Sequence, residues 1–389
     1  MVLARGIPFP RDPRRWLLKR DGEITADLVS RLKQLGIEEV WIRHPALEFL
    51  DDAIDDELED HRRDLYARVR ETFVRFATGS PCDLDFDRFE TSIRDLFIVL
   101  NDHDRSHVLL SKLDAHDNYL LSHSANVCYL AMLLGMKTSG YISSTGLARC
   151  GSAEVTDLQH LALGCLLHDV GKMRVPLKIL NKPGRLTEEE MEVVRRHPRD
   201  GYEMLKGQIP EPAADIVLNH HQRFNGQGYP SRIDAVTGEP SAPLAGEEIP
   251  IFSRIATIVD VYDAATSRRV YSRAKPPVQV LYEMRTWCEG FFDPVLEQAF
   301  YEIIPPLPIG QVVRLSDGSE AVVIDFDPRH PAQPRVQQLS YPGGESLDQH
   351  VGEEIDLAQC DGLHVHEIDG QDVRAFLASQ QGELAGAGV

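Results

Sequence analysis

The sequence lacks several features that would place it in other classes of protein. Its six cysteines form no CxxC pair, which is typical of reduced thiols and argues against a zinc ribbon or a disulfide framework. Its first residues, MVLARGIPFPRDPRR, contain no apolar run of the kind found in a cleaved secretion signal. The most apolar stretch, 119–136, is interrupted by polar residues from Ser122 to Asn126, so no spanning helix is expected. We therefore predict a soluble, cytoplasmic protein.

Basic charge is also scarce. The chain has 41 lysine and arginine residues against 61 aspartate and glutamate residues, which gives a net charge of -20. This balance argues against a sequence-independent grip on DNA or RNA, because such binding needs basic patches. A small anionic substrate remains compatible with it, since bound divalent cations reverse the local field.

The predicted fold is mainly α, a helical bundle with small β-containing attachments at both ends. With 389 residues the chain can bury one large core and add smaller segments. The expected divisions are a small α/β segment at 1–50, a helical connector at 51–115, a main helical domain at 116–304, a β-rich segment at 305–370 and a frayed tail at 371–389. No internal repeat is found.

Local patterns predict several elements. Helices are expected at 23–36, from the acidic run 51–60 to Ala77, and at 86–113, with a strand at 38–43 and a loop at 137–155. Thr187 and Glu190 predict a capping box that opens the helix carrying His197. Two alternating runs separated by Asp317 and Gly318 predict a β-hairpin.

Residues of the types that bind transition metals recur at helical positions between 123 and 260. A single histidine at such a position is more often a core residue with satisfied hydrogen bonds. Several imidazoles and carboxylates buried together without a metal would leave many polar groups to satisfy, however, so a metal site is the better interpretation. The candidates are His123, His168, Asp169, His197, His220, His221 and Asp260.

The sequence LLHDVGK contains the strongest of these signals. His168 and Asp169 are adjacent, imidazole suits transition metals, and a carboxylate can bridge two of them. Gly171 allows the backbone to pack close to the ion that these two residues would share. Lys172 adds a cation that could hold a phosphate oxygen.

A second motif, HHQRFNGQGYP, begins at His220. The paired histidines would supply one metal ion, and the turn from Gly226 to Pro230 would place Tyr229 and bare backbone against a ligand. Taken alone, the Gly-Tyr-Pro sequence is better interpreted as a plain loop.

Together these motifs resemble the HD-GYP subgroup of the HD-domain phosphohydrolases, whose known activity is hydrolysis of cyclic di-GMP. The resemblance covers roughly 117–274 and rests on segments that occur in the family's order: DNYLLSHS, LLHDVGK, HP at His197, HHQRFNGQGYP and DVYDAATSRRVY. Residues 1–45 and 306–368 also resemble segments often found before and after this domain.

The resemblance implies two metal sites, commonly occupied by iron or manganese. One would use His123, His168, Asp169 and Asp260, and the second His197, His220 and His221, with Asp169 bridging. Asp263, one turn after Asp260, would support a ligand, although the two aspartates could exchange roles. The implied substrate contacts are Lys172, Gly228, Tyr229, Pro230, Arg269 and Arg273.

The chain also departs from the family pattern. Gln222 and Asn225 stand where glutamate and aspartate are usual, and Ser272 replaces a basic residue, for which Arg273 is a candidate substitute. Members that bind three metals have glutamate where this chain has Tyr119, so two metals are predicted.

The expected chemistry is two-metal hydrolysis of cyclic di-GMP to linear pGpG by a bridging metal-bound hydroxide, with Asp169 and Lys172 as catalytic residues. One alternative is a weak or inactive receptor that binds the dinucleotide or a diguanylate cyclase (GGDEF) partner. Another is an HD enzyme acting on a different nucleotide. The flanking segments would serve packing, homodimer formation or regulation.

Overall fold

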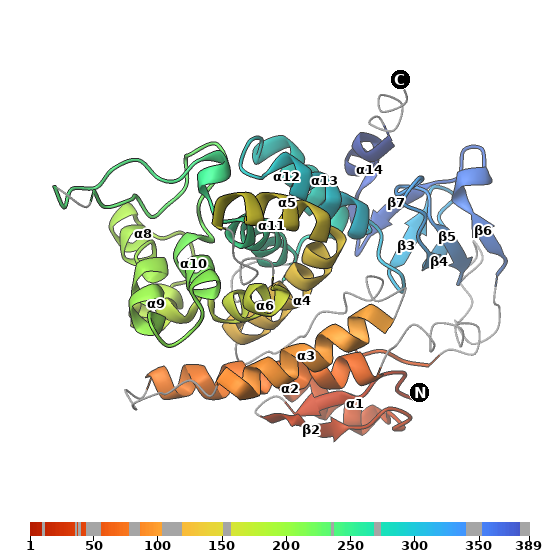
Figure 1. Ribbon diagram of the computed structural model, residues 1–389. Coiled ribbons are helices and arrows are strands. Elements are labelled where there is room, and N and C mark those ends of the chain that lie inside the picture. The colour runs from red at the N-terminus through yellow and green to blue at the C-terminus, as the bar shows by residue number, and fades with distance from the viewer. Residues whose placement is uncertain are drawn as a thin grey trace.

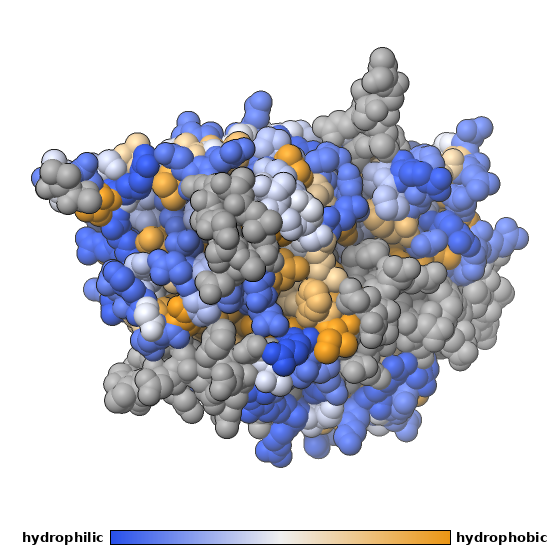
Figure 2. All heavy atoms as spheres, in the orientation of Figure 1, coloured by the Kyte–Doolittle hydropathy of each residue, from blue (hydrophilic) through white to orange (hydrophobic). Residues whose placement is uncertain are grey.

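Figure 1 shows the computed structural model of the chain, which is mainly α, as predicted. It describes residues 1–9, 12–35, 37, 40–43, 56–77, 86–102, 119–150, 157–234, 237–267, 274–339 and 352–381. Among these residues, no helix is long and apolar enough to cross a membrane. The face seen in Figure 2 is largely hydrophilic, with exposed apolar side chains in small groups.

A helical bundle forms the body of the molecule around helix α4 (Tyr119–Lys137). Every residue from Leu121 to Leu134 is buried, because α2, α6, α11 and α13 pack around the helix. A helix enclosed in this way is apolar on all sides, which explains the long apolar stretch in a chain without a spanning helix. The other helices of the bundle are α2 (Asp56–Ala77), α3 (Phe86–Asp102), α5 (Ser139–Cys150), α6 (Leu158–Leu167), η3 (Val170–Arg174), α7 (Leu177–Leu180), α8 (Glu188–Val194), α9 (His197–Leu205), α10 (Glu211–Asn219), η4 (Gly246–Glu248), α11 (Ile251–Thr266), α12 (Pro277–Trp287) and α13 (Pro294–Ile303).

Helices α2 and α3, which match the helical patterns expected after residue 50, lie along one side of this bundle (Figure 1). Their buried residues, among them Leu65, Phe73 and Leu96, belong to the same hydrophobic core as those of α4 and α11. The predicted connector therefore packs as part of the bundle. The expected continuation of α3 to residue 113 lies outside the described residues.

The loop predicted at 137–155 is wrong for residues 139–150, which form helix α5. Its serine and glycine content disfavours a helix, but tertiary packing overrides that preference. Ile142 is buried in the core, and the Tyr141 hydroxyl donates to Asp293 Oδ2 at 2.9 Å.

The N-terminal segment has its own small core of Leu3, Ile7, Ile24 and Leu32. It contains the antiparallel strands β1 (Ile7–Phe9) and β2 (Asp12–Leu18) and the predicted helix, α1 (Ala26–Gln34), capped by Thr25. The strand expected at 38–43 is wrong for its described residues: Ile42 makes only an isolated bridge to Leu3. The segment packs on α2, where the Arg63 guanidinium lies 3.5 Å from the centre of the Trp16 ring.

The C-terminal segment is a sheet with the strand order β6-β5-β4-β3-β7-β8 among the described residues. The predicted hairpin is confirmed, because β3 and β4 pair antiparallel and Gly318 takes a φ of 88° in the turn between them. The tail predicted from 371 is wrong for residues 371–381, where Val373 and Leu377 are buried against α12 and the sheet. The elements are β3 (Val312–Leu315), β4 (Glu320–Asp325), β5 (Arg335–Gln338), β6 (Glu354–Asp356), β7 (Val365–Ile368), β8 (Gln371–Asp372) and α14 (Arg374–Gln381).

A buried ion pair joins three helices of the bundle. Arg254 Nη1 of α11 lies 2.6 Å from Asp293 Oδ2, which also accepts the Tyr141 hydroxyl of α5. Asp293 Oδ1 caps helix α13 by accepting from the Val295 amide at 3.0 Å. Removing one partner of such a pair leaves an uncompensated buried charge.

We predict that Asp293→Asn lowers the free energy of unfolding by about 3 to 5 kcal/mol, because asparagine keeps the cap and loses the ion pair. Chemical denaturation measures the change. Asp157→Asn is the matched control, since Asp157 caps α6 from an exposed position and forms no ion pair with a described residue. Equal stability of the two variants would contradict the prediction.

Candidate metal centre

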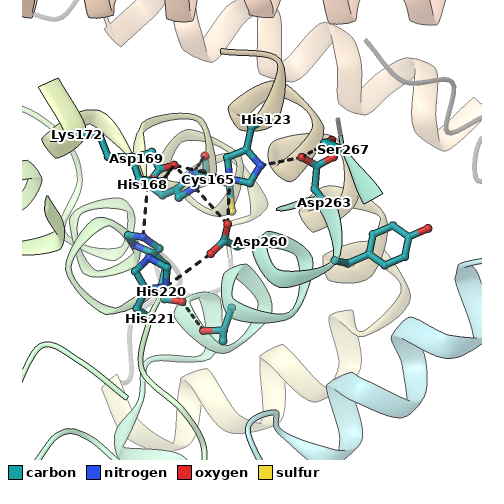
Figure 3. Close-up of polar contacts among 12 residues, drawn as sticks. His123, Cys165, His168, Asp169, Lys172, His220, His221, Asp260, Asp263 and Ser267 are labelled. Atoms are coloured by element: carbon teal, nitrogen blue, oxygen red, sulfur yellow. Dashed lines mark hydrogen bonds and ion pairs between the residues drawn. The ribbon is translucent and has the colours of Figure 1, made fainter. Parts of the chain in front are cut away.

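The seven predicted ligands converge at one place, as Figure 3 shows for most of them. They come from elements that are distant in sequence. His123 lies in the middle of α4, His168 and Asp169 follow the last turn of α6, His197 begins α9, the His220–His221 pair ends α10, and Asp260 lies on α11. All are buried except His221, which is partly exposed.

Asp169 lies between two groups of histidines. Its Oδ2 is 3.7 Å from His123 Nε2 and 3.4 Å from His168 Nε2. Its Oδ1 is 3.2 Å from His197 Nε2 and 3.9 Å from His220 Nε2. The two oxygens of one carboxylate therefore face the two ligand groups separately, which is the arrangement that a bridging ligand requires.

Helix ends orient three of the imidazoles. The last carbonyls of a helix lack partners within it, and here they accept from histidine rings: His168 Nδ1 is 2.7 Å from the Cys165 carbonyl, His197 Nδ1 is 2.8 Å from that of Val194, and His220 Nδ1 is 3.0 Å from that of Val217. We assign the proton of each ring to Nδ1 from these acceptors. The lone pair on Nε2 is then directed into the cluster, as in metal-binding histidines.

The imidazole of His123 is oriented by a carboxylate instead of a helix carbonyl. His123 Nδ1 is 2.7 Å from Asp263 Oδ2, and the Ser267 hydroxyl donates to the same oxygen at 3.1 Å. His123 Nε2 is 3.0 Å from Asp260 Oδ1 on the inner side. Asp260 thus faces the cluster and Asp263 stands behind His123, which agrees with the first of the two role assignments considered for these aspartates.

The donor set fits divalent transition metals. His197 Nε2 and His220 Nε2 lie 3.1 Å apart, and with both Nδ1 atoms protonated their lone pairs would repel unless they share a cation. His168 Nε2 and Asp169 Oδ1 are buried without a hydrogen-bond partner. Buried polar atoms are normally satisfied, and imidazole with carboxylate is a combination that iron, manganese and zinc accept.

The surroundings favour the ligand forms of these groups. Burial would raise the pKa of Asp169, but Lys172 and His168 hold it well below its usual value. Burial lowers the pKa of His220 well below 6.5 and that of His221 to about 3, so both rings are neutral. Burial would also lower the pKa of His123, but the hydrogen bonds to Asp260 and Asp263 raise it to about 9. A metal ion would displace that proton.

Lys172 reaches this centre from η3. Its Nζ lies 2.5 Å from Asp169 Oδ2, and the side chain remains partly exposed. The cation is therefore at the edge of the cluster, where an anionic ligand can meet it.

Gly171 is required for the position of His197. A Cβ atom at residue 171 would lie 2.6 Å from the amide nitrogen of Gly201 and would overlap the carbonyl of His197, both on α9. The sequence predicts a close approach of this glycine to a metal ion, whereas the close contact in the structure is with α9. The capping box of Thr187 and Glu190 is also confirmed, but the helix that it opens, α8, ends at Val194 and does not carry His197, which begins the next helix.

The Gly-Tyr-Pro loop folds back over the paired histidines. The Tyr229 ring stacks on His221 with centroids 4.6 Å apart and an interplanar angle of 25°. Gly228 has no room for a side chain, because a Cβ there would lie 2.6 Å from the His221 carbonyl oxygen. Gln222, one of the departures from the family, contacts the loop backbone and none of the candidate ligands.

Other predicted residues are not all placed. Arg269, Ser272 and Arg273 lie outside the described residues, as does the side chain of Tyr119. Sequence reasoning also missed Thr257, whose hydroxyl donates to the His220 carbonyl at 2.9 Å and lies 3.3 Å from that of Gln222. Its position one turn before Asp260 on α11 was the available signal.

Comparison with known proteins finds a family match and several relatives. A family described as "HD domain" matches residues 142–296. The chain is 35% identical over 239 residues to a cyclic di-GMP phosphodiesterase of Pseudomonas aeruginosa, covering 60% of this chain and 51% of that protein. It is 34% identical over 169 residues to a cyclic di-GMP phosphodiesterase of Thermotoga maritima, covering 42% of each chain. It is also 34% identical over 139 residues to a 3'3'-cGAMP-specific phosphodiesterase of Vibrio cholerae, covering 35% of this chain and 24% of that protein. The chain thus spans about half the length of these relatives, or less, and the match to the HD-domain family lies within the main helical domain predicted at 116–304.

We predict that Gly171→Ala lowers the free energy of unfolding by about 1 to 3 kcal/mol, because the methyl group must displace the first turn of α9. Thermal unfolding measures the effect on stability. Metal occupancy of the site formed by His197, His220 and His221 should also fall. Gly140→Ala on α5 is the control, since a Cβ there meets nothing within 4 Å. A variant at 171 as stable as the variant at 140 would refute the packing argument.

Metal analysis separates the roles of Asp260 and Asp263. We expect Asp260→Asn to remove a ligand and abolish one ion per chain, whereas Asp263→Asn should weaken metal affinity about 10- to 100-fold through His123. Asp361→Asn, the same substitution at an exposed position, should change neither the number of bound ions nor the metal affinity. The assignment is reversed if Asp263→Asn loses the ion and Asp260→Asn keeps it.

Proposed function

We propose that this chain, an HD-domain protein with the HD-GYP motifs, is a metal-dependent phosphodiesterase that hydrolyses cyclic di-GMP. The observation that carries the proposal is the position of Asp169, with one oxygen toward each ligand group and Lys172 beside it. The substrate class is supported by the relatives, two of which are cyclic di-GMP phosphodiesterases. Because the chain spans only part of those proteins, its own activity requires a direct test.

The proposed cofactors are two divalent ions, with iron or manganese as the expected metals. His123, His168, Asp169 and Asp260 would hold one ion, and His197, His220 and His221 the second, with Asp169 shared. When bound, such a pair activates water and stabilises charge on phosphoryl oxygens.

The chain's own residues would orient the substrate. Lys172 would pair with a non-bridging phosphate oxygen and stabilise the charge that grows there during attack. Its partner Asp169 keeps the ammonium group at the cluster before substrate arrives. Tyr229, between Gly228 and Pro230, would contact a base, and Arg269 and Arg273 remain proposed contacts to phosphate.

We propose linear pGpG as the product, since opening the ring requires cleavage of one ester and the proposed site has two ions. The cytoplasm is the proposed location. A diguanylate cyclase partner and a homodimer remain predictions.

The direct test is turnover by protein loaded anaerobically with iron or manganese, with cyclic di-GMP and its products followed by chromatography. A competing cyclic dinucleotide, 3'3'-cGAMP, belongs in the same assay, because one relative is named for that substrate. Tight binding of cyclic di-GMP without cleavage by fully loaded protein would favour a receptor. Preference for 3'3'-cGAMP would favour an enzyme of different specificity.

We predict that Lys172→Met lowers kcat/KM for cyclic di-GMP about 100- to 1000-fold, because a donor aimed at the developing charge is lost. Metal content should persist, since removing a neighbouring cation does not weaken cation binding. Lys178→Met, at an exposed position on α7, should leave kcat/KM unchanged. Full activity of Lys172→Met would exclude the proposed role.

A further inference from the structure

Gln222 follows the paired histidines directly and is buried, with 2% of its surface exposed. A buried amide must satisfy both a donor and an acceptor. Its Nε2 donates to the Pro230 carbonyl at 2.7 Å, and its Oε1 accepts from the Leu244 amide at 3.2 Å. Both ends of the side chain are therefore used on backbone groups.

These two bonds join the first residue of the loop 222–230 to the last and to a segment outside the loop. The bond to Pro230 spans eight residues of sequence, and the bond from Leu244 spans 22 residues. An ionised carboxylate in the same place would still accept from Leu244. It would, however, direct an oxygen at the Pro230 carbonyl oxygen, and two acceptors repel.

Neighbouring bonds show how firmly the start of the loop is anchored. The Phe224 amide donates to the Phe291 carbonyl at 2.8 Å, and the Phe224 carbonyl accepts from the Gly246 amide at 2.7 Å. The Arg223 guanidinium lies 3.8 Å from the centre of the Phe291 ring. The start of the loop thus has several attachments. At its end, the side chain of Gln222 holds the Pro230 carbonyl, and the Arg199 guanidinium donates to the carbonyl of the next residue, Ser231.

Tyr229 lies between these attachments. Its amide donates to the His221 carbonyl at 3.1 Å and its ring stacks on the His221 imidazole. The position of this ring above a candidate ligand therefore depends on how residues 228–230 are held.

We propose that Gln222 is a positioning residue that fastens the Gly-Tyr-Pro loop and thereby holds Tyr229 beside the metal centre, where a cyclic dinucleotide would meet it. The inference rests on the proposed function, because it assumes that the dinucleotide occupies this side of the centre. A small phosphodiester can reach the centre without contacting the loop. Comparing it with cyclic di-GMP therefore separates an effect on substrate binding by the loop from an effect on hydrolysis at the centre.

The experiment compares Gln222→Glu and Gln222→Leu with the matched control Gln227→Glu. Gln227 is exposed in the same loop, so Gln227→Glu adds the same charge as Gln222→Glu and breaks no side-chain hydrogen bond to a described residue. Three quantities are measured on metal-loaded protein: kinetics with cyclic di-GMP, kinetics with bis(p-nitrophenyl) phosphate, and metal content. Hydrogen exchange at the Tyr229 and Leu244 amides is followed separately.

For both Gln222 variants we expect KM for cyclic di-GMP to rise about tenfold, which corresponds to the loss of the buried hydrogen bond to Pro230 that both variants share. The rate with bis(p-nitrophenyl) phosphate and the metal content should stay within about twofold of the parent. Exchange at Tyr229 should be faster in both variants. Exchange at Leu244 should be faster only in Gln222→Leu, since glutamate keeps that acceptor. Gln227→Glu should match the parent throughout.

Unchanged KM and unchanged exchange in the Gln222 variants would overturn the proposal. Loss of metal or of activity on the small diester would also overturn it, because Gln222 would then support the fold of the centre rather than the loop. Failure of the proposed function is distinguishable: the parent protein would not cleave cyclic di-GMP, while the exchange pattern of the variants would still report whether Gln222 fastens the loop.

Discussion

The two carboxylates Asp169 and Asp260 are ionised inside a helical core, although burial disfavours the charged form. The other groups of the centre offset the free-energy cost of burying that negative charge. Isolated buried carboxylates would take up protons. Here imidazole nitrogens surround them at 3.0 to 3.9 Å, and Lys172 lies against Asp169. Metal cations are the remaining element of such a balance, since the neutral rings of His220 and His221 offer lone pairs and no positive charge. A bound metal ion would also displace the proton of His123, whose pKa is raised to about 9.

Helix ends supply the geometry that the charges require. His168 and His220 each stand at the end of a helix, and His197 follows one closely, so that unpaired carbonyls fix the ring orientation without further polar side chains. His123 lies within α4, where carbonyls are already used in the helix, and it needs Asp263 instead. The position of a ligand on its helix thus determines what kind of group supports it.

The convergence of the seven candidate ligands could be predicted from sequence, because few roles other than metal binding suit so many histidines and aspartates at buried helical positions. The supporting contacts could not, since the carbonyls of Cys165 and Val194 carry no residue signature. The break between α8 and α9 was missed because the capping box marks only where a helix begins. Helix α5 was missed because packing of Ile142 outweighs a poor local propensity, and α14 because the burial of Leu377 depends on the distant helix α12.

Two of the departures from the usual motif, Gln222 and Asn225, lie in the loop 222–230. Gln222 is close to His221 in sequence, yet its bonds go to Pro230 and Leu244, and Asn225 accepts from the Gln227 amide within the loop. Neither side chain contacts the groups around Asp169. A change from glutamate to glutamine here alters the hydrogen bonding of the loop and leaves the donor set of the centre intact. Under the proposed function, these two departures would therefore bear on how a large substrate is held, and they leave the candidate ligands unchanged.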